Sequence, residues 1–292
     1  MKTAPSISLI VLFCALAQLA CAAEGVWGNN RRLFALPVPK KVTVDGKLDD
    51  WDTSGAMFVT LNREVAERFH GWIMTMYDEE AIYIGARVRD DTPMNNLHGP
   101  EGDAQWAWNA DAMQFRFFTD PSVGPTVFRE KGKTYPVAHL LLWYFSLEEK
   151  PCMKLSFGYR FRPYGGGTGV VPPDRYAAAY RKNDDETGYS LEYRLPWELF
   201  GMEEPLRAGD IVPGTVQIMF DDGSGLRSPR RFAASDLLSA YAPNPWRQYE
   251  SWGRIIFSDR RSLPTQFTRI QNTPERPTPL SLSYELPEDS VV

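Results

Sequence analysis

The chain has 292 residues, of which 43% are hydrophobic, 24% charged and 13% aromatic, and its formal net charge is −5. This is the composition of a globular protein, long enough to bury a sizeable core in one large or two small domains. Three His and three Cys are too few for repeated zinc or iron–sulfur ligand sets, and the acidic balance argues against nucleic acid as a partner. The composition therefore favours binding of a neutral ligand.

Residues 1–23 have the features of a secretory signal peptide. An N-terminal lysine precedes an apolar run over residues 7–17, and small residues follow it. The run is too short for a membrane span, and no other stretch of the sequence is long and apolar enough for one. We expect cleavage after Ala22 or Ala23 and export to the periplasm or the medium, with lipidation at Cys21 as the alternative.

Removal of this leader leaves Cys152 as the single cysteine of the exported chain. One cysteine cannot form an internal disulfide, so the fold is expected to form without bridges. Cys152 lies at the start of a predicted strand, and we interpret it as a small buried side chain.

Short strand patterns fill residues 37–258. Residues 81–88 alternate, with Ile82 and Ile84 on one face and Tyr83 and Arg87 on the other. Short strands with Gly, Pro and Asp at their joints, and no βαβ alternation, predict an all-β single domain with little helix. We expect an antiparallel β-sandwich of jelly-roll or immunoglobulin-like type. Helical turns are predicted over 62–69 and 196–200, and further strands over 72–77, 112–118, 140–145, 154–161, 175–181, 189–195, 216–220 and 253–257.

The remaining segments flank this domain. Residues 24–36 form a lead-in, and residues 259–292, rich in Pro and charge, are expected to be a flexible tail. The glycine-rich segment 164–169 is interpreted as a mobile strand connector, because it lacks the Gly-Lys-Ser/Thr of a phosphate-binding loop and the helix that follows a dinucleotide fingerprint.

Neighbouring carboxylates recur at the ends of predicted strands, where Asp stabilises turns by hydrogen bonding. Adjacent residues on a strand point to opposite faces, so such a doublet is not the carboxylate pair of a glycoside hydrolase. Turn formation is favoured, with a structural calcium ion as the alternative role. The doublets are Asp49–Asp50, Asp90–Asp91, Asp184–Asp185 and Asp221–Asp222.

Three tryptophans lie in polar, turn-forming segments, where an indole is unexpected. Trp106 and Trp108 belong to residues 101–109, and Trp246 belongs to residues 242–248. An indole ring suits the C–H face of a pyranose, while amide and Arg side chains bind its hydroxyls. The tryptophans expected in the core instead are Trp51, Trp72, Trp143, Trp197 and Trp252.

Six motifs resemble, in order and spacing, those of the family 9 carbohydrate-binding modules, which belong to the wider DOMON-like sandwiches. The resemblance spans about residues 37–258. The motifs are VDGKLDDW at 44–51, YDEEAIYIGARVRD at 77–90, WNADAMQF at 108–115, GYSLEYRLPW at 188–197, VQIMFDD at 216–222 and WRQYESWG at 246–253.

This resemblance implies a secreted, non-catalytic module that holds a plant-type or related polysaccharide chain between two tryptophans, in support of carbohydrate catabolism. Trp108 matches the first tryptophan of the family and Trp246 the second, with Trp106 in reserve. Asn244 and Arg247 flank Trp246 as candidate hydroxyl partners.

The same resemblance has implications for Gln114, for Glu192 and for calcium binding. Gln114 stands where the family has a sugar-contacting Glu; its amide can still bond hydroxyls, but the change weakens the inference of the same ligand. Glu192 matches a family Glu that we interpret as structural. Family members often hold calcium, and the resemblance does not place its ligands in this chain.

Other functions stay open. Some DOMON-like sandwiches bind b-type haem, which needs axial His or Met ligands. A glycoside hydrolase would need two carboxylates in one cleft, but no catalytic constellation accompanies His70, His98 or His139, which are interpreted as structural. A scaffold domain with a decayed site is the last alternative. The oligomeric state is left open. The candidate haem ligands are the methionines on predicted strands: Met74, Met76, Met113 and Met219.

Overall fold

The computed structural model describes residues 32–60, 65–123, 136–158, 160–202, 204–228, 230–234, 249 and 252–259. These ranges belong to one compact unit, residues 28–265. The predicted signal peptide, and the predicted tail beyond residue 259, lie outside the described residues. Within the described ranges, no helix combines the length and the apolar character needed to cross a membrane.

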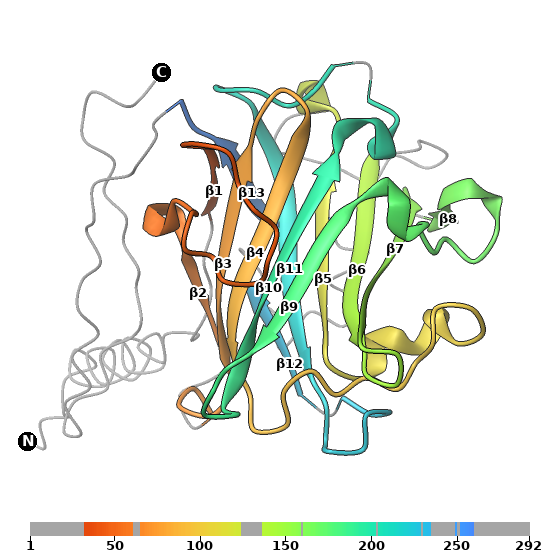
Figure 1. The fold of residues 1–292 in the computed structure, drawn as a ribbon. Helices are drawn as coiled ribbons and strands as arrows, with labels where there is room; N and C mark the ends of the chain where they lie inside the picture. The colour runs from red at the N-terminus through yellow and green to blue at the C-terminus, as the bar shows by residue number, and fades with distance from the viewer. Residues whose placement is uncertain are drawn as a thin grey trace, which may run out of the picture. The chain divides into compact units, whose positions relative to one another are not determined.

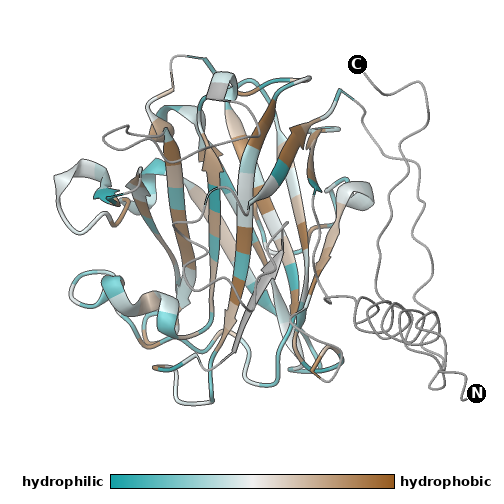
Figure 2. Ribbon diagram, turned by 180° about the vertical axis from the view of Figure 1, so that it is seen from behind, coloured by the Kyte–Doolittle hydropathy of each residue, from teal (hydrophilic) through white to brown (hydrophobic). Residues whose placement is uncertain are grey.

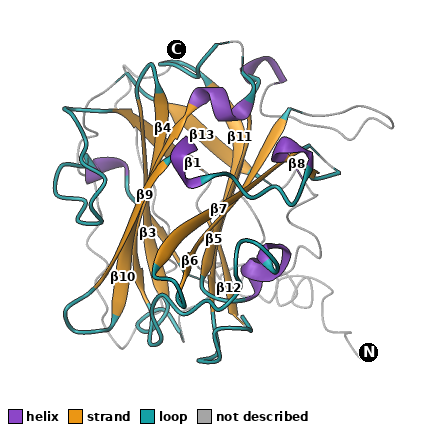
Figure 3. Ribbon diagram, turned by 45° about the vertical axis from the view of Figure 1, so that its right-hand side comes forward, coloured by secondary structure: helices purple, strands orange, loops and turns teal. Residues whose placement is uncertain are grey.

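Strands joined by short 3-10 helices make up the described chain (Figure 3). The strands are β1 (Arg32–Pro37), β2 (Met57–Val59), β3 (His70–Tyr77), β4 (Ala81–Arg89), β5 (Ala112–Phe118), β6 (Val137–Phe145), β7 (Lys150–Phe157), β8 (Arg162–Pro163), β9 (Ala177–Lys182), β10 (Gly188–Pro196), β11 (Ile211–Phe220), β12 (Arg230–Ala234) and β13 (Gly253–Phe257). The 3-10 helices are η1 (Thr53–Gly55), η2 (Ala104–Asn109), η3 (Pro121–Val123), η4 (Tyr164–Gly166), η5 (Pro173–Arg175) and η6 (Trp197–Phe200).

The strands form one sheet that curls into two layers, in the order β8-β7-β6-β5-β11-β13-β1-β3-β4-β10-β9 (Figure 1). β12 pairs with β11, and β2 pairs with β3, beyond this path. β1 joins the layers, because it pairs in parallel with β13 through residues 32–35 and with β3 through residues 35–37. The all-β sandwich prediction is confirmed, although these two parallel pairs make the sheet mixed rather than purely antiparallel.

The core lies between the layers, where alternate residues of each strand point inward. Hydrophobic and hydrophilic residues accordingly alternate along several strands (Figure 2). Phe115 and Ile218 come from one layer, and Ile84 and Tyr193 from the other, all fully buried. Among the tryptophans predicted for the core, Trp72 is the exception, since it is half-buried. The others, together with Cys152, are buried as predicted: Trp51, Trp143, Trp197 and Trp252.

Each predicted strand has an observed counterpart. The largest error is the strand predicted over 154–161, because β7 ends at Phe157 and Gly158 turns the chain at a φ of 65°. β1, β2, β8 and β12 were not predicted, and β1 begins within the lead-in 24–36. The turn predicted over 196–200 is η6, and the described part of 62–69 is a hydrogen-bonded turn.

A buried glutamate fastens the loop that carries the first sequence motif. Glu192 on β10 is fully buried, and its Oε atoms accept hydrogen bonds from the backbone N–H groups of Asp45, Gly46 and Leu48 at 2.8–3.2 Å. Gly85 on β4 lies beneath this loop, and a Cβ there would come within 2.8 Å of the Trp51 ring. The structural role predicted for Glu192 is therefore confirmed.

Three buried carboxylates lie where β4, β5 and β11 meet their loops. Asp111 accepts the backbone N–H groups of Asn95 and Asp221, at 2.8 and 2.7 Å. Asp90 Oδ1 accepts the Thr92 N–H, while its Oδ2 has no hydrogen-bond partner among the described residues. Burial, reinforced by the Asp221 charge, raises the pKa of Asp90 to about 6. Burial also raises the pKa of Asp111.

Replacing Glu192 by Ala should lower the free energy of unfolding by about 3 kcal/mol, because the change leaves three backbone donors, two of them buried, without an acceptor. Urea unfolding measures this loss. Glu198→Ala is the matched control, since Glu198 forms an exposed ion pair with Arg175 and its loss should cost less than about 1 kcal/mol. Equal effects of the two changes would contradict the role given to Glu192.

Replacing Asp90 by Asn should change how stability depends on pH. The folded chain holds a proton on Asp90 up to about pH 6, which the unfolded chain releases near 3.8, so this carboxylate lowers the free energy of unfolding as pH rises through that window. Relative to wild type, Asp90→Asn should gain up to about 3 kcal/mol between pH 4 and pH 7.

Urea unfolding at several pH values tests this difference. His70 and His139 have lowered pKa values and titrate with the opposite sign, but they contribute equally to both proteins and cancel. Asp91→Asn, an exposed neighbour paired with Arg68, is the control and should show no such trend. A difference between Asp90→Asn and wild type that is independent of pH would refute the assignment.

Candidate functional site

The outer face of the β11-β5-β6-β7 layer is arranged in rows by the strand register. One row is apolar and contains Met219, Ala112, Trp143 and Cys152. The next row contains Gln217, Gln114, Leu141 and Lys154, and the third contains Thr215, Arg116, His139 and Ser156. Because successive residues of a strand alternate between its faces, these side chains lie opposite the main core.

The helix η2 covers the apolar row. Ala104 and Ala107 of η2 form a second buried cluster with residues of that row, and Trp108 packs against its edge. The buried Asn96 holds η2 from behind, since its Nδ2 donates to the carbonyl oxygens of Ala107 at 2.8 Å and Asp111 at 3.0 Å. Trp108 is therefore fixed at the border between the apolar row and the polar rows.

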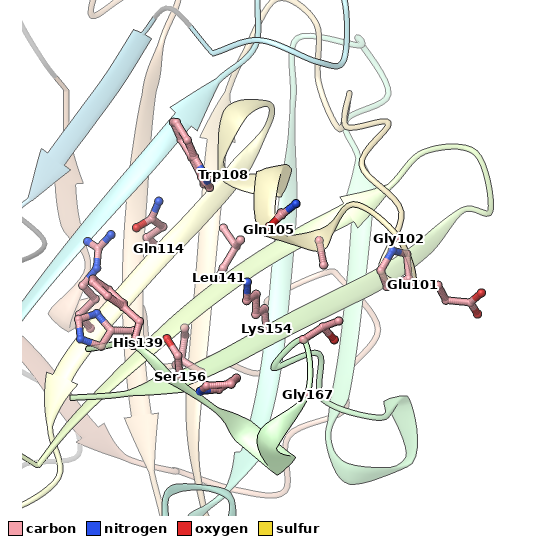
Figure 4. Close-up of a pocket in the computed structure, with 17 residues that line it drawn as sticks. Glu101, Gly102, Gln105, Trp108, Gln114, His139, Leu141, Lys154, Ser156 and Gly167 are labelled. Carbon is pink, nitrogen blue, oxygen red and sulfur yellow. The ribbon is translucent and has the colours of Figure 1, made fainter. Parts of the chain in front are cut away.

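A cavity of about 590 Å³ lies over the polar rows (Figure 4). Gln105 and Trp108 of η2 form one wall, and Gly167 and Thr168 of the glycine-rich segment form part of another. That segment closes on β7 through a hydrogen bond from Leu155 N to the Gly169 carbonyl at 2.8 Å. Residues 164–169 therefore connect strands as predicted, and part of this segment also lines the cavity. The strand residues in the lining are Gln114, Arg116, His139, Leu140, Leu141, Lys154 and Ser156.

The cavity floor combines positive charge with a neutral imidazole. The buried Arg116 donates from Nη1 to Gln217 Oε1 at 2.9 Å. His139 is 6% exposed, its ring packs 4.5 Å from that of Phe161, and neither ring nitrogen has a hydrogen-bond partner among the described residues. Burial, and then the Arg116 charge, holds the pKa of His139 well below its usual range. Burial also lowers the pKa of Lys154.

The predicted site residues divide into three groups. Trp108 and Gln114 both line the cavity. Trp106 is 49% exposed and is not part of the described lining, and its ring lies 6.2 Å from that of Trp108. Three predicted sugar-binding residues lie outside the described residues, so their roles stay predictions: Asn244, Trp246 and Arg247.

Sequence reasoning missed several lining residues, and strand alternation offered a signal for one of them. Arg116 lies two residues after Gln114 on a correctly predicted strand, so the two share a face. His139 and Lys154 join them only through the register of β6 and β7, which the sequence does not reveal. Gln105 and Ser156 complete this missed set.

The Asp221–Asp222 doublet has the hydrogen bonds of a turn. Asp221 accepts hydrogen bonds from Thr92, Asn95, Gly223 and Gly225, so its oxygens are occupied by donors as in a turn. No group of three or more His, Cys, Asp or Glu side chains in the described part of the chain is arranged to hold a metal ion. Calcium therefore stays a prediction from sequence.

The described lining of the cavity offers few of the groups that glycoside hydrolysis or haem binding requires. Glu101 is the one carboxylate in its described lining, whereas glycoside hydrolysis needs two. The methionines considered as haem ligands are buried and do not belong to that lining: Met74, Met76, Met113 and Met219.

Comparisons with known proteins concern the fold. No protein-family model matches the sequence, and no curated protein matches it either. Among solved structures, the chain is similar to a family 9 carbohydrate-binding module from Caldicellulosiruptor kristjanssonii in complex with cellotriose, with a TM-score of 0.51 and 16% identity over 80% of this chain and 98% of that chain. A module of this family from the same organism in complex with glucose gives a TM-score of 0.50 and 15% identity over 80% and 99%. This chain therefore has the fold of the family 9 carbohydrate-binding modules.

Proposed function

We propose that the protein binds a glycan in the cavity beside Trp108. The observation that carries this proposal is that the Trp108 indole meets amide, hydroxyl and imidazole groups in a single hollow. A pyranose has an apolar C–H face and a rim of hydroxyls, and this lining offers a partner for each. The two structures of similar fold contain cellotriose and glucose, which supports a sugar as the ligand.

A second tryptophan would complete the grip on the sugar. Trp246 lies in the segment that connects β12 and β13, and both of these strands pair with β11, the neighbour of the strand that carries Gln114. Stacking by Trp108 and Trp246 on the two faces of one ring, in an exported protein that acts on plant-type or related polysaccharides, is the finer form of the proposal.

Trp108→Ala should weaken binding of cello- or xylo-oligosaccharides at least about tenfold, because the change removes a stacking surface. Gln114→Ala should weaken binding by a smaller factor, since it removes a neutral hydrogen bond. Isothermal titration calorimetry measures both effects. The intrinsic tryptophan fluorescence should respond to sugar in wild type and lose most of this response in Trp108→Ala.

Two control variants separate the site from general effects on the protein. Leu147→Ala alters an exposed side chain outside the described lining and should bind as wild type does. Trp72→Phe removes a half-buried indole on β3 and should keep the sugar-induced fluorescence change. Full binding by a Trp108→Ala/Trp246→Ala double variant would refute the site, and silence of the wild-type protein on a glycan array would refute the function.

A further inference from the structure

The described lining of the cavity is cationic although the chain as a whole is acidic. Arg116 and Lys154 contribute two positive charges from β5 and β7, and Glu101 is the one carboxylate in this lining. Glu101 is exposed, and its charge acts on Lys150, outside the described lining. The described lining of the cavity therefore has an excess of positive charge, which binding of a neutral sugar would not require.

Lys154 is a cation of this lining without a counterpart among the described residues. It is half-buried, and its ammonium group has neither an ion pair nor a hydrogen bond to the described residues. Partial burial of an ammonium group costs free energy unless an anion or a set of acceptors compensates for the lost water. A ligand that brings an anionic group to Lys154 would supply this compensation.

The register of the strands gives the space available for such a ligand. Gln114, Leu141 and Lys154 are neighbours across β5, β6 and β7, so the Cα atoms of Gln114 and Lys154 lie about 10 Å apart. Leu141 provides an apolar floor between them. A single pyranose ring could lie over Leu141 with its hydroxyls toward Gln114 and a substituent toward Lys154.

We propose that the bound glycan contains a uronic acid, whose carboxylate forms an ion pair with the Lys154 ammonium group, while Arg116 adds a second positive charge to the floor. This inference rests on the glycan-binding function proposed above and names the class of sugar. The neutral imidazole of His139, with one donor and one acceptor nitrogen, and the hydroxyl of Ser156 then serve the ring hydroxyls.

Calorimetry with matched pairs of ligands tests the proposal: cellotriose against its C6-oxidised form, and galactotriose against trigalacturonate. Wild type should bind at least one of the uronates about tenfold more tightly than its neutral partner, the order expected for one charge-assisted hydrogen bond. This preference should shrink in 0.5 M NaCl, because salt screens a partly exposed ion pair, while binding of the neutral sugars stays constant.

Variants at position 154 assign the effect to one charge. Lys154→Met keeps the aliphatic stem and should reduce the preference to within about twofold. Lys154→Arg should retain it, which shows that the altered site still folds. Lys154→Glu should reverse it. Lys182→Met, an exposed lysine on β9 in the other layer, is the control and should retain the wild-type preference.

The outcomes distinguish this inference from the proposed function. Wild-type binding of the neutral sugars that equals or exceeds binding of both uronates would overturn the inference and leave glycan binding intact. Failure of all four ligands and of a glycan array would overturn both. An equal gain from a 6-sulfated trisaccharide would show a general anion site and overturn the assignment to a carboxylate.

Discussion

The position of Trp108 depends on the buried carboxylate of Asp111. This side chain accepts one backbone N–H from the loop after β4 and another from the end of β11, so it joins three segments that are distant in sequence. Asn96, held in the first of these segments, then fixes η2. Burial of a carboxylate is costly, and the two hydrogen bonds offset part of that cost. Rigidity of the cavity wall formed by η2 is thus obtained at the expense of stability near neutral pH.

The strand register of the β11-β5-β6-β7 layer also places apolar and polar side chains in separate rows on its outer face. The row that contains Trp143 is apolar and is covered by η2, whereas the two rows beside it are polar and form the floor of the cavity. Because each row takes one residue from each of four strands, charges far apart in sequence gather there. Arg116 and Lys154 create a positive site on a chain whose net charge is −5. Overall composition could not predict this local arrangement, because it averages over the whole chain.

The sequence was sufficient to predict the fold class, most strands and the core, because alternation of apolar residues along a strand is a local signal. Trp108 was proposed because an indole is unexpected in a polar segment, and Gln114 because of the family resemblance; both line the cavity. Sequence reasoning missed β1, since residues 33–37 of this strand are a continuous apolar run without alternation, close to the predicted leader. It missed His139 and Lys154 as site residues because their meeting depends on which strands pair and in which register, and several registers fit the same alternation.

The pairing of β1 with β13 has a consequence for how the protein folds. Arg32 is aligned with Arg254, so the contact that joins the two layers links opposite ends of the domain. A loop of this length carries a large closure entropy, and contacts of such high sequence separation form slowly. During synthesis, β3 and β4 can pair early, but the layers cannot be joined until the last strand has left the ribosome. Until β13 is available, the edges of β1 and β11 that it pairs with therefore stay exposed to contacts with other chains.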